Sequence, residues 1–235
     1  IIKYPPLKDM DGKLVNLSPQ WLRLLKKVDR ASNIDQIQLP IHEKSLKSLE
    51  LLLDDHLFES GKLRIVFGPG SKMSSKCWPE KSFIELGIRL INAYPNLEIL
   101  IVGGSEDYKV AKSLLESWNM SNANNYCGKL SIGESAELIR KCDMYIGNDT
   151  GTMHLAAMAG IMCVAIFSAR DYPGLWEPFG DQHITIRKNI KCAGCMLASC
   201  SEYDNACLKL IGVDEVFSAV VSQLSTNAYI STPLV

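Results

Sequence analysis

Two loops of this 235-residue chain carry residue types that bind anions. The first loop, residues 68–79, is rich in Gly and Ser and contains Ser71 and Lys76. Small residues let the backbone approach a ligand, exposed amides attract anions, and a lysine adds positive charge. The loop lacks the GxxxxGKS/T spacing of a P-loop, and Met73 stands where a GxGxxG motif has its last Gly. Anion binding and an ordinary flexible loop both remain open for this segment.

The second loop, residues 147–160, is a polar Gly-Asn-Asp-Thr-Gly turn followed by a run of small residues. The small residues predict a helix that lies close against a sheet, with its N-terminal amides directed at a bound phosphate. His154 would lie in the first turn, where the helix dipole lowers its pKa and keeps the ring neutral. A histidine buried in the core is the alternative interpretation. The candidate binding residues of this loop are Asp149, Thr150, Gly151, Thr152 and His154.

Two further side chains follow apolar runs and suit a phosphate-bearing ligand. Glu106, after a Gly-Gly-Ser sequence, is suited to accept hydrogen bonds from a sugar hydroxyl, or simply to favour the start of a helix. Arg170 is suited to a bidentate contact with phosphate, or to a solvated pair with Asp171. Several loops thus point to the same chemistry, and their agreement favours an anion site more than any single loop does.

Four of the eight cysteines form a cluster with the spacing C-x2-C-x4-C-x6-C. They are Cys192, Cys195, Cys200 and Cys207. Four thiolates suit a tetrahedral structural site for zinc or iron, although the later spacings match no standard zinc knuckle. A disulfide pair and reduced structural thiols are the alternatives. The other four cysteines stand singly in the sequence, which favours the reducing cytoplasm.

Short apolar runs alternate with amphipathic segments from residue 61 onward. A parallel sheet covered by helices on both faces has this pattern, so we predict a doubly wound, Rossmann-like α/β domain over residues 61–225. Ligands of such sheets bind at the carboxyl ends of the strands, where the loops above would lie. Strands are expected at Leu63–Phe67, Leu97–Val102, Met144–Ile146, Cys163–Phe167 and His183–Ile186. Helices are expected at Glu80–Asn92, Glu106–Trp118, Ser131–Lys141, Thr152–Ala159 and Val213–Leu224.

The two ends of the chain have a different pattern. Residues 1–40 contain four of the ten prolines and one helical pattern, which begins at Ser18, so we expect a helical and irregular extension. A second helix is expected over residues 42–60, and residues 226–235 form a tail. The chain does not begin with Met, and we therefore expect that it is processed or is part of a longer protein.

Charge and hydropathy exclude further classes of protein. The 25 Lys and Arg residues balance the 26 Asp and Glu residues, which excludes a broadly basic nucleic-acid binder. No apolar run reaches the roughly 18 residues of a membrane span, and the first residues lack the pattern of a secretory signal. We therefore expect a small-molecule ligand and no nucleic-acid partner.

Three segments together resemble glycosyltransferase family 9, whose type members are the ADP-heptose:lipopolysaccharide heptosyltransferases. They are Lys76–Glu80, Gly147–Ala156 and Trp176–Gly180. The resemblance covers about residues 41–225 and implies the C-terminal, nucleotide-sugar-binding half of a GT-B fold. It also implies that residues 1–40 are a remnant or extension of an N-terminal acceptor domain, and that residues 41–60 are a linking helix.

The resemblance also implies roles for individual residues. Ser71 and Lys76 match contacts to the diphosphate, and the segment 149–154 matches contacts to the diphosphate and the sugar. Glu106 matches an acid near the ribose, and Leu130 matches a position that packs on the base. Some relatives carry a similar run of cysteines before the last helix.

The implied reaction is transfer of a sugar from an ADP-sugar to a lipopolysaccharide or other glycan acceptor, with inversion and without a cofactor. Such an enzyme works in the cytoplasm, and peripheral contact with the inner face of a bacterial cytoplasmic membrane is a further expectation. The catalytic base of the family is an acidic residue of the N-terminal domain, and it has no counterpart here. We therefore expect this chain to bind nucleotide but not to transfer sugar by itself.

Three other functions remain open. A GT-B nucleotide-sugar epimerase would need acidic and histidine groups from two domains, and the Asp-Thr-Gly-x-x-His turn fits it less well. A non-catalytic nucleotide-binding module would need no acceptor domain. A metal–sulfur interaction domain would be built around the cysteine cluster, and its stability would depend on metal rather than on nucleotide.

Overall fold

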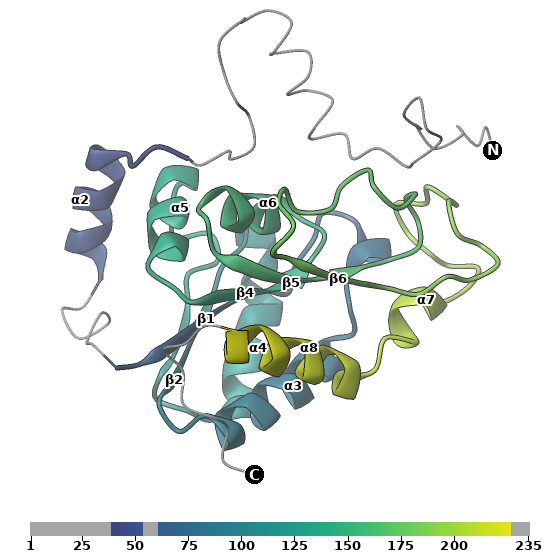
Figure 1. The fold of residues 1–235 in the computed structure, drawn as a ribbon, viewed down its shortest axis with the longest axis horizontal. Coiled ribbons are helices and arrows are strands. Elements are labelled where there is room, and N and C mark those ends of the chain that lie inside the picture. The colour runs from purple at the N-terminus through teal and green to yellow at the C-terminus, as the bar shows by residue number, and fades with distance from the viewer. Residues whose placement is uncertain (1–38, 54–60, 227–235) are drawn as a thin grey trace, which may run out of the picture.

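The computed structural model describes residues 39–53 and 61–226 (Figure 1). Its centre is a six-stranded sheet in which neighbouring strands are parallel, in the order β3-β2-β1-β4-β5-β6. This order places the topological switch between β1 and β4. The strands are β1 (Leu63–Gly68), β2 (Leu97–Ile101), β3 (Ala123–Asn125), β4 (Met144–Asn148), β5 (Met162–Phe167) and β6 (Ile184–Arg187).

Helices cover both faces of this sheet, so the predicted doubly wound α/β fold is confirmed (Figure 1). One face is covered by α3 (Glu80–Ala93), α4 (Tyr108–Trp118) and α8 (Val213–Thr226). The other face is covered by α2 (Glu43–Leu52), α5 (Ile132–Arg140) and α6 (Gly151–Met158). The short elements are the 3-10 turns η2 (Ser74–Lys76) and η3 (Ser105–Asp107) and the helix α7 (Ala206–Lys209).

Every residue of β1 is buried because helices press on both of its sides. Ile65 and Phe67 belong to the core beneath α3, α4 and α8, and Val66 between them belongs to the opposite core. The Phe67 ring packs edge-on against Phe83 and Trp118, with ring centroids 6.1 and 5.3 Å away. A parallel sheet packed in this way holds the ends of its strands in fixed positions, and the loops that follow them start from a rigid edge.

The predicted linking helix docks on α5. Its described part, α2, is shorter than expected, and residues 54–60 lie outside the described residues. The His42 amide donates a hydrogen bond to the buried Glu137 carboxylate (3.0 Å). Arg140 donates to the Leu39 carbonyl (2.8 Å). These bonds fix the segment before α2 onto the sheet domain.

Two elements have no counterpart in the predicted pattern. The sequence of β3 is Ala-Asn-Asn, which contains no apolar run, and α7 has only four residues. The helix expected from Glu106 begins as the turn η3 and becomes α4 at Tyr108. The predicted extension over residues 1–40, its helix from Ser18 and the tail from residue 226 lie almost wholly outside the described residues. Within the described ranges, no helix combines the length and the apolar character needed to cross a membrane.

Candidate functional site

A cavity of about 690 Å³ opens at the carboxyl ends of β1, β2 and β4, beside the topological switch. Cavities of this size hold small organic ligands and cofactors. Eight of the ten candidate residues outside the cysteine cluster line it: Ser71, Lys76, Glu106, Leu130, Asp149, Thr150, Gly151 and Thr152. His154 and Arg170 are not among its lining residues. The fold thus brings together loops that are up to about 80 positions apart in the sequence.

Asn148, the last residue of β4, ties the loop after β1 to the sheet. Its side-chain amide donates to the Pro69 carbonyl (2.6 Å), and its side-chain oxygen accepts from the Trp78 amide (3.0 Å). Asn148 is fully buried, so its polar groups depend on these protein partners. The sequence predicts no role for Asn148, although Asn148 stands within the Gly-Asn-Asp-Thr-Gly turn. Its side chain holds in place the loop that carries Ser71 and Lys76.

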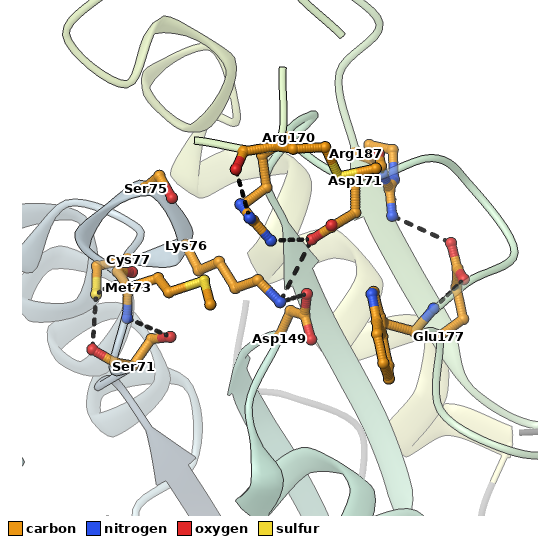
Figure 2. A network of polar contacts seen from close by, with 12 residues as sticks. Ser71, Met73, Ser75, Lys76, Cys77, Asp149, Arg170, Asp171, Glu177 and Arg187 are labelled. Atoms are coloured by element: carbon orange, nitrogen blue, oxygen red, sulfur yellow. Dashed lines mark hydrogen bonds and ion pairs between the residues drawn. The ribbon is translucent and has the colours of Figure 1, made fainter. Parts of the chain in front are cut away.

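Lys76 links this loop to the ends of β4 and β5 (Figure 2). Its ammonium nitrogen lies 2.6 Å from the Asp149 carboxylate and 3.4 Å from the Asp171 carboxylate. The three side chains are only 11, 6 and 6% exposed. Burial raises the pKa of Asp149, and the Lys76 ammonium opposes this rise. The cavity wall therefore carries a buried ion pair between Lys76 and Asp149, both of which line the cavity.

A second polar group fixes the start of α6. The Tyr145 hydroxyl lies 2.9 Å from the Thr152 hydroxyl, which lies 2.8 Å from that of Thr150. Burial raises the pKa of Tyr145, which favours its protonated hydroxyl. Thr150 is the N-cap of α6 but makes no side-chain bond to the helix amides. A Cβ on Gly151 would meet nothing within 4 Å, so this first turn faces open space.

Asp107 lines the cavity and was missed by the sequence reasoning. Its carboxylate accepts a hydrogen bond from the Gly104 amide (2.9 Å), and burial raises its pKa. A Cβ on Gly70 would lie 1.9 Å from an Asp107 oxygen, and one on Gly103 would lie 2.5 Å away. The predicted reason for the small residues of the loop with Gly70 is close approach of a ligand. The structure gives Gly70 and Gly103 another reason, which is to leave room for Asp107.

His154 and Arg170 differ from the other candidates. Burial, more than any other cause, lowers the pKa of His154, while nearby Asp149 opposes the shift. The predicted direction is confirmed, but burial replaces the helix dipole as its main cause. The Arg170 guanidinium donates to the carbonyls of Met196 and Leu197 and to Asp171. Its contacts are thus with protein groups outside the cavity.

The four clustered cysteines line a second cavity of about 10 Å³, together with Arg170 and Asn205. All eight cysteines of the chain lie in the described ranges and are free thiols. Among those residues, no group of three or more His, Cys, Asp or Glu side chains is arranged to hold a metal ion. The metal site therefore stays a prediction. Burial raises the pKa of Cys192, which favours its thiol form.

The sequence also matches a family description. A model of glycosyltransferase family 9 (heptosyltransferase) matches residues 21–205, which is most of the chain. The chain belongs to glycosyltransferase family 9. Among curated relatives, lipooligosaccharide heptosyltransferase 2 of Campylobacter jejuni is 26% identical over 199 residues. That match covers 82% of this chain and 61% of the relative, so the chain spans about three fifths of the length of the relative.

Solved structures of family 9 members share the fold. The ADP-heptose lipopolysaccharide heptosyltransferase II of Escherichia coli superposes with a TM-score of 0.61 at 22% identity, over 80% of this chain and 54% of that chain. The family 9 glycosyltransferase of Veillonella parvula superposes with a TM-score of 0.73 at 20% identity, over 94% of this chain and 63% of that chain. The sheet domain described above is therefore the fold of one part of these longer proteins.

Proposed function

We propose that this chain forms the nucleotide-sugar-binding half of a heptosyltransferase and that its donor, an ADP-sugar, binds in the 690 Å³ cavity. The observation that carries the proposal is the convergence of Lys76, Asp149 and the start of α6 on one cavity at the topological switch. A buried cation and uncapped helix amides suit a diphosphate. Family membership and the heptosyltransferase names of the relatives support the same donor class.

The proposed roles follow the position of each residue in the cavity. Ser71, Lys76 and the amides of Gly151 and Thr152 bind the diphosphate. Glu106 accepts hydrogen bonds from the ribose, and Leu130 packs on the adenine. Asp149 orients Lys76 through the 2.6 Å ion pair. Thr150 contacts the diphosphate or the sugar. The family resemblance gives His154 the same role although His154 does not line the cavity, and burial, which lowers its pKa, favours its neutral ring.

In the proposed reaction an acceptor hydroxyl, deprotonated by a base, attacks the anomeric carbon, and ADP leaves with inversion of that centre. Negative charge grows on the departing diphosphate, where Lys76 and the α6 amides stabilise it electrostatically. No cofactor takes part. The acceptor is a lipopolysaccharide or related glycan, reached in the cytoplasm at the inner face of the membrane. The family resemblance assigns the base and the acceptor site to the N-terminal half, so we propose no catalytic base within this chain.

Calorimetry with ADP tests the donor site. Lys76→Ala should weaken ADP binding by about 1.5–3 kcal/mol, because a charge-assisted contact to the diphosphate is lost. Lys112→Ala is the matched control, since Lys112 pairs with Glu116 (3.6 Å) on the exposed surface of α4 and should leave the affinity unchanged. ADP should bind more tightly than UDP or GDP. Equal affinity of Lys76→Ala and the wild type, or no binding of any nucleotide, would contradict the proposal.

We also propose a structural zinc or iron ion at the cysteine cluster. Cys192, Cys195, Cys200 and Cys207 line one small cavity, and four thiolates form a tetrahedral set for either metal. The thiols would have to turn toward one another to bind it, because their described arrangement holds no metal-binding group. Elemental analysis of the purified protein should give about one metal ion per chain and should lose it in Cys195→Ser but not in Cys77→Ser. A metal-free protein would leave free thiols or a disulfide, which mass spectrometry without reductant separates.

A further inference from the structure

Arg170 contacts the cysteine segment, which we define as residues 192–207. Its Nε donates to the Leu197 carbonyl (2.7 Å), and one Nη donates to the Met196 carbonyl (2.9 Å). In return, the Met196 amide donates to the Arg170 carbonyl (3.0 Å). Met196 has a φ of 57°, a left-handed conformation that a residue with a side chain adopts only at an energetic cost. These bonds hold the cysteine segment in one conformation against Arg170.

The cysteine segment also holds the loop that carries Lys76. The Leu197 carbonyl accepts a hydrogen bond from the Ser75 hydroxyl (2.5 Å) in addition to the one from Arg170. The Ser75 amide donates to the Ala198 carbonyl (3.2 Å), and Ser75 is buried. The Leu197 carbonyl thus bonds to both Arg170 and Ser75. Because Ser75 directly precedes Lys76, this carbonyl links Arg170 to the backbone that carries Lys76.

Arg170 and Lys76 share one carboxylate. The Asp171 Oδ2 lies 2.6 Å from Arg170 and 3.4 Å from Lys76, whereas Lys76 lies 2.6 Å from Asp149 (Figure 2). The two cations and two carboxylates are each at least 89% buried, and their charges balance. Without Arg170, the Asp171 carboxylate would be a buried charge with Lys76 as the cation in contact with it. A buried charge in that position attracts its remaining partner strongly.

We propose that Arg170 is a positioning residue for Lys76. By binding the Asp171 carboxylate from outside the cavity, it leaves the Lys76 ammonium beside Asp149 on the cavity wall. Of the two interpretations that the sequence left open for Arg170, this role takes up the pair with Asp171, which is buried, in place of the direct phosphate contact. It rests on the proposed function for the identity of the ligand, but the arrangement of the four charges does not depend on that ligand.

A double-mutant cycle on ADP binding tests the proposal. Arg170→Gln should weaken binding roughly tenfold or more, because Asp171 then draws Lys76 away from the cavity. Asp171→Asn should stay within about threefold of the wild type, since Lys76 keeps its contact with Asp149. The double variant Arg170→Gln/Asp171→Asn removes one charge of each sign. It should regain most of the lost affinity, to within about threefold of the wild type.

Two other roles for Arg170 give different results. If Arg170 bound phosphate directly, the double variant would bind as weakly as Arg170→Gln. If Arg170 only supported the fold, the double variant would bind ADP at least as weakly as Arg170→Gln, because the Arg170 guanidinium and the Asp171 carboxylate would both be lost. Either result overturns the proposal. Arg89→Gln and Arg89→Gln/Asp214→Asn are matched controls, because this pair (2.5 Å) joins α3 to α8 away from the cavity, and both should bind ADP like the wild type.

A measurement without ligand separates this proposal from the proposed function. Crystal structures of the ligand-free variants show where the Lys76 ammonium lies. In Arg170→Gln it should lie closer to the Asp171 carboxylate than to Asp149, and in the double variant it should return to Asp149. An unchanged position of Lys76 in Arg170→Gln overturns the role of Arg170. A wild type that binds no ADP, while Lys76 moves in this way, overturns only the donor assignment.

Discussion

Lys76 and Arg170 begin from similar positions in the sequence and end in different environments. Each is a cation in a loop after a buried parallel strand, and both contact Asp171. Lys76 lines the large cavity at the carboxyl edge of the sheet, whereas Arg170 lines the small cavity of the cysteines. Residue type and strand position therefore predict at which edge of the sheet a side chain lies. The contacts of that side chain depend on which segments from later in the sequence pack over that edge.

The loops that carry Lys76 and Arg170, after β1 and β5, also differ in what holds them in place. The loop after β1 is held by Asn148 on the adjacent strand β4 and, at Ser75, by the carbonyls of Leu197 and Ala198. The loop after β5 is held by residues 194–197, a stretch with no helix or strand. The bonds of Asn148 join two segments that stand out by their composition, whereas the bonds from residues 194–198 come from main-chain groups of an irregular stretch. Three predictions test this contrast.

The largest effect is expected at Asn148. Asn148→Ala leaves the Trp78 amide and the Pro69 carbonyl without their buried partner, and should lower the free energy of unfolding by about 2–4 kcal/mol. Urea unfolding at neutral pH measures this loss. Asn122→Ala, at an exposed loop position, is the control and should stay within about 0.5 kcal/mol of the wild type. A loss below 1 kcal/mol for Asn148→Ala would show that this side chain does not hold the β1 loop.

Much of the fold was predictable because buried parallel strands have apolar runs that stand out from the sequence. Five of the six strands were expected within about two residues of their observed ends. The strand β3 was missed because its Ala-Asn-Asn sequence pairs at the sheet edge, where burial no longer demands apolar residues. The short helix α7 was missed because one turn carries no periodicity.

The candidate site was predictable to the extent that its residues follow strands directly. Seven candidates in the loops after predicted strands line the cavity because the ends of parallel strands meet at one edge, and the eighth, Leu130, came only from the family resemblance. Asp107 was missed because its position depends on two glycines, Gly70 and Gly103, that come from different loops. The environment of Arg170 was not predictable, because it is made of main-chain carbonyls at residues 196 and 197, and the sequence does not encode carbonyl positions directly.

An intermediate effect is expected from pH at the loop after β5. The His183 ring accepts from the Cys163 amide at Nδ1 (3.1 Å) and faces the Phe179 carbonyl at Nε2 (2.9 Å), an arrangement that suits only the neutral ring. Burial lowers the pKa of His183, so the unfolded chain binds the proton more tightly. The free energy of unfolding should therefore fall as pH drops below about 6.5, by at most about 1.4 kcal/mol per pH unit for this group.

Urea unfolding of His183→Asn over the same pH range measures that contribution. Asn keeps an acceptor for the Cys163 amide but does not titrate, so its unfolding free energy should depend less steeply on pH between about 7.5 and 5.5. Asp107 and Asp149, whose pKa values burial raises, act in the opposite sense at lower pH and are common to both proteins. Parallel curves for the two proteins would show that His183 keeps its ordinary pKa in the fold.

The smallest effect is expected at Glu106, an exposed acid on the cavity rim beside the more buried Asp107. If Glu106 accepts a hydrogen bond from the ribose, Glu106→Gln should weaken ADP binding by about 0.5–1.5 kcal/mol, since the charge-assisted bond becomes a neutral one. Calorimetry with ADP measures this change. Glu116→Gln on the exposed surface of α4 is the matched control and should bind ADP like the wild type.

The identity of the hydroxyl that Glu106 contacts follows from the same experiment with 2′-deoxy-ADP. The wild type should lose more affinity on going from ADP to 2′-deoxy-ADP than Glu106→Gln does, because the wild type loses a charge-assisted bond and the Gln variant loses only a neutral one. Two additive losses would mean that Glu106 acts on the ligand only through its charge. In that case the role of Glu106, like that of Arg170, could not be predicted from its position after a strand alone.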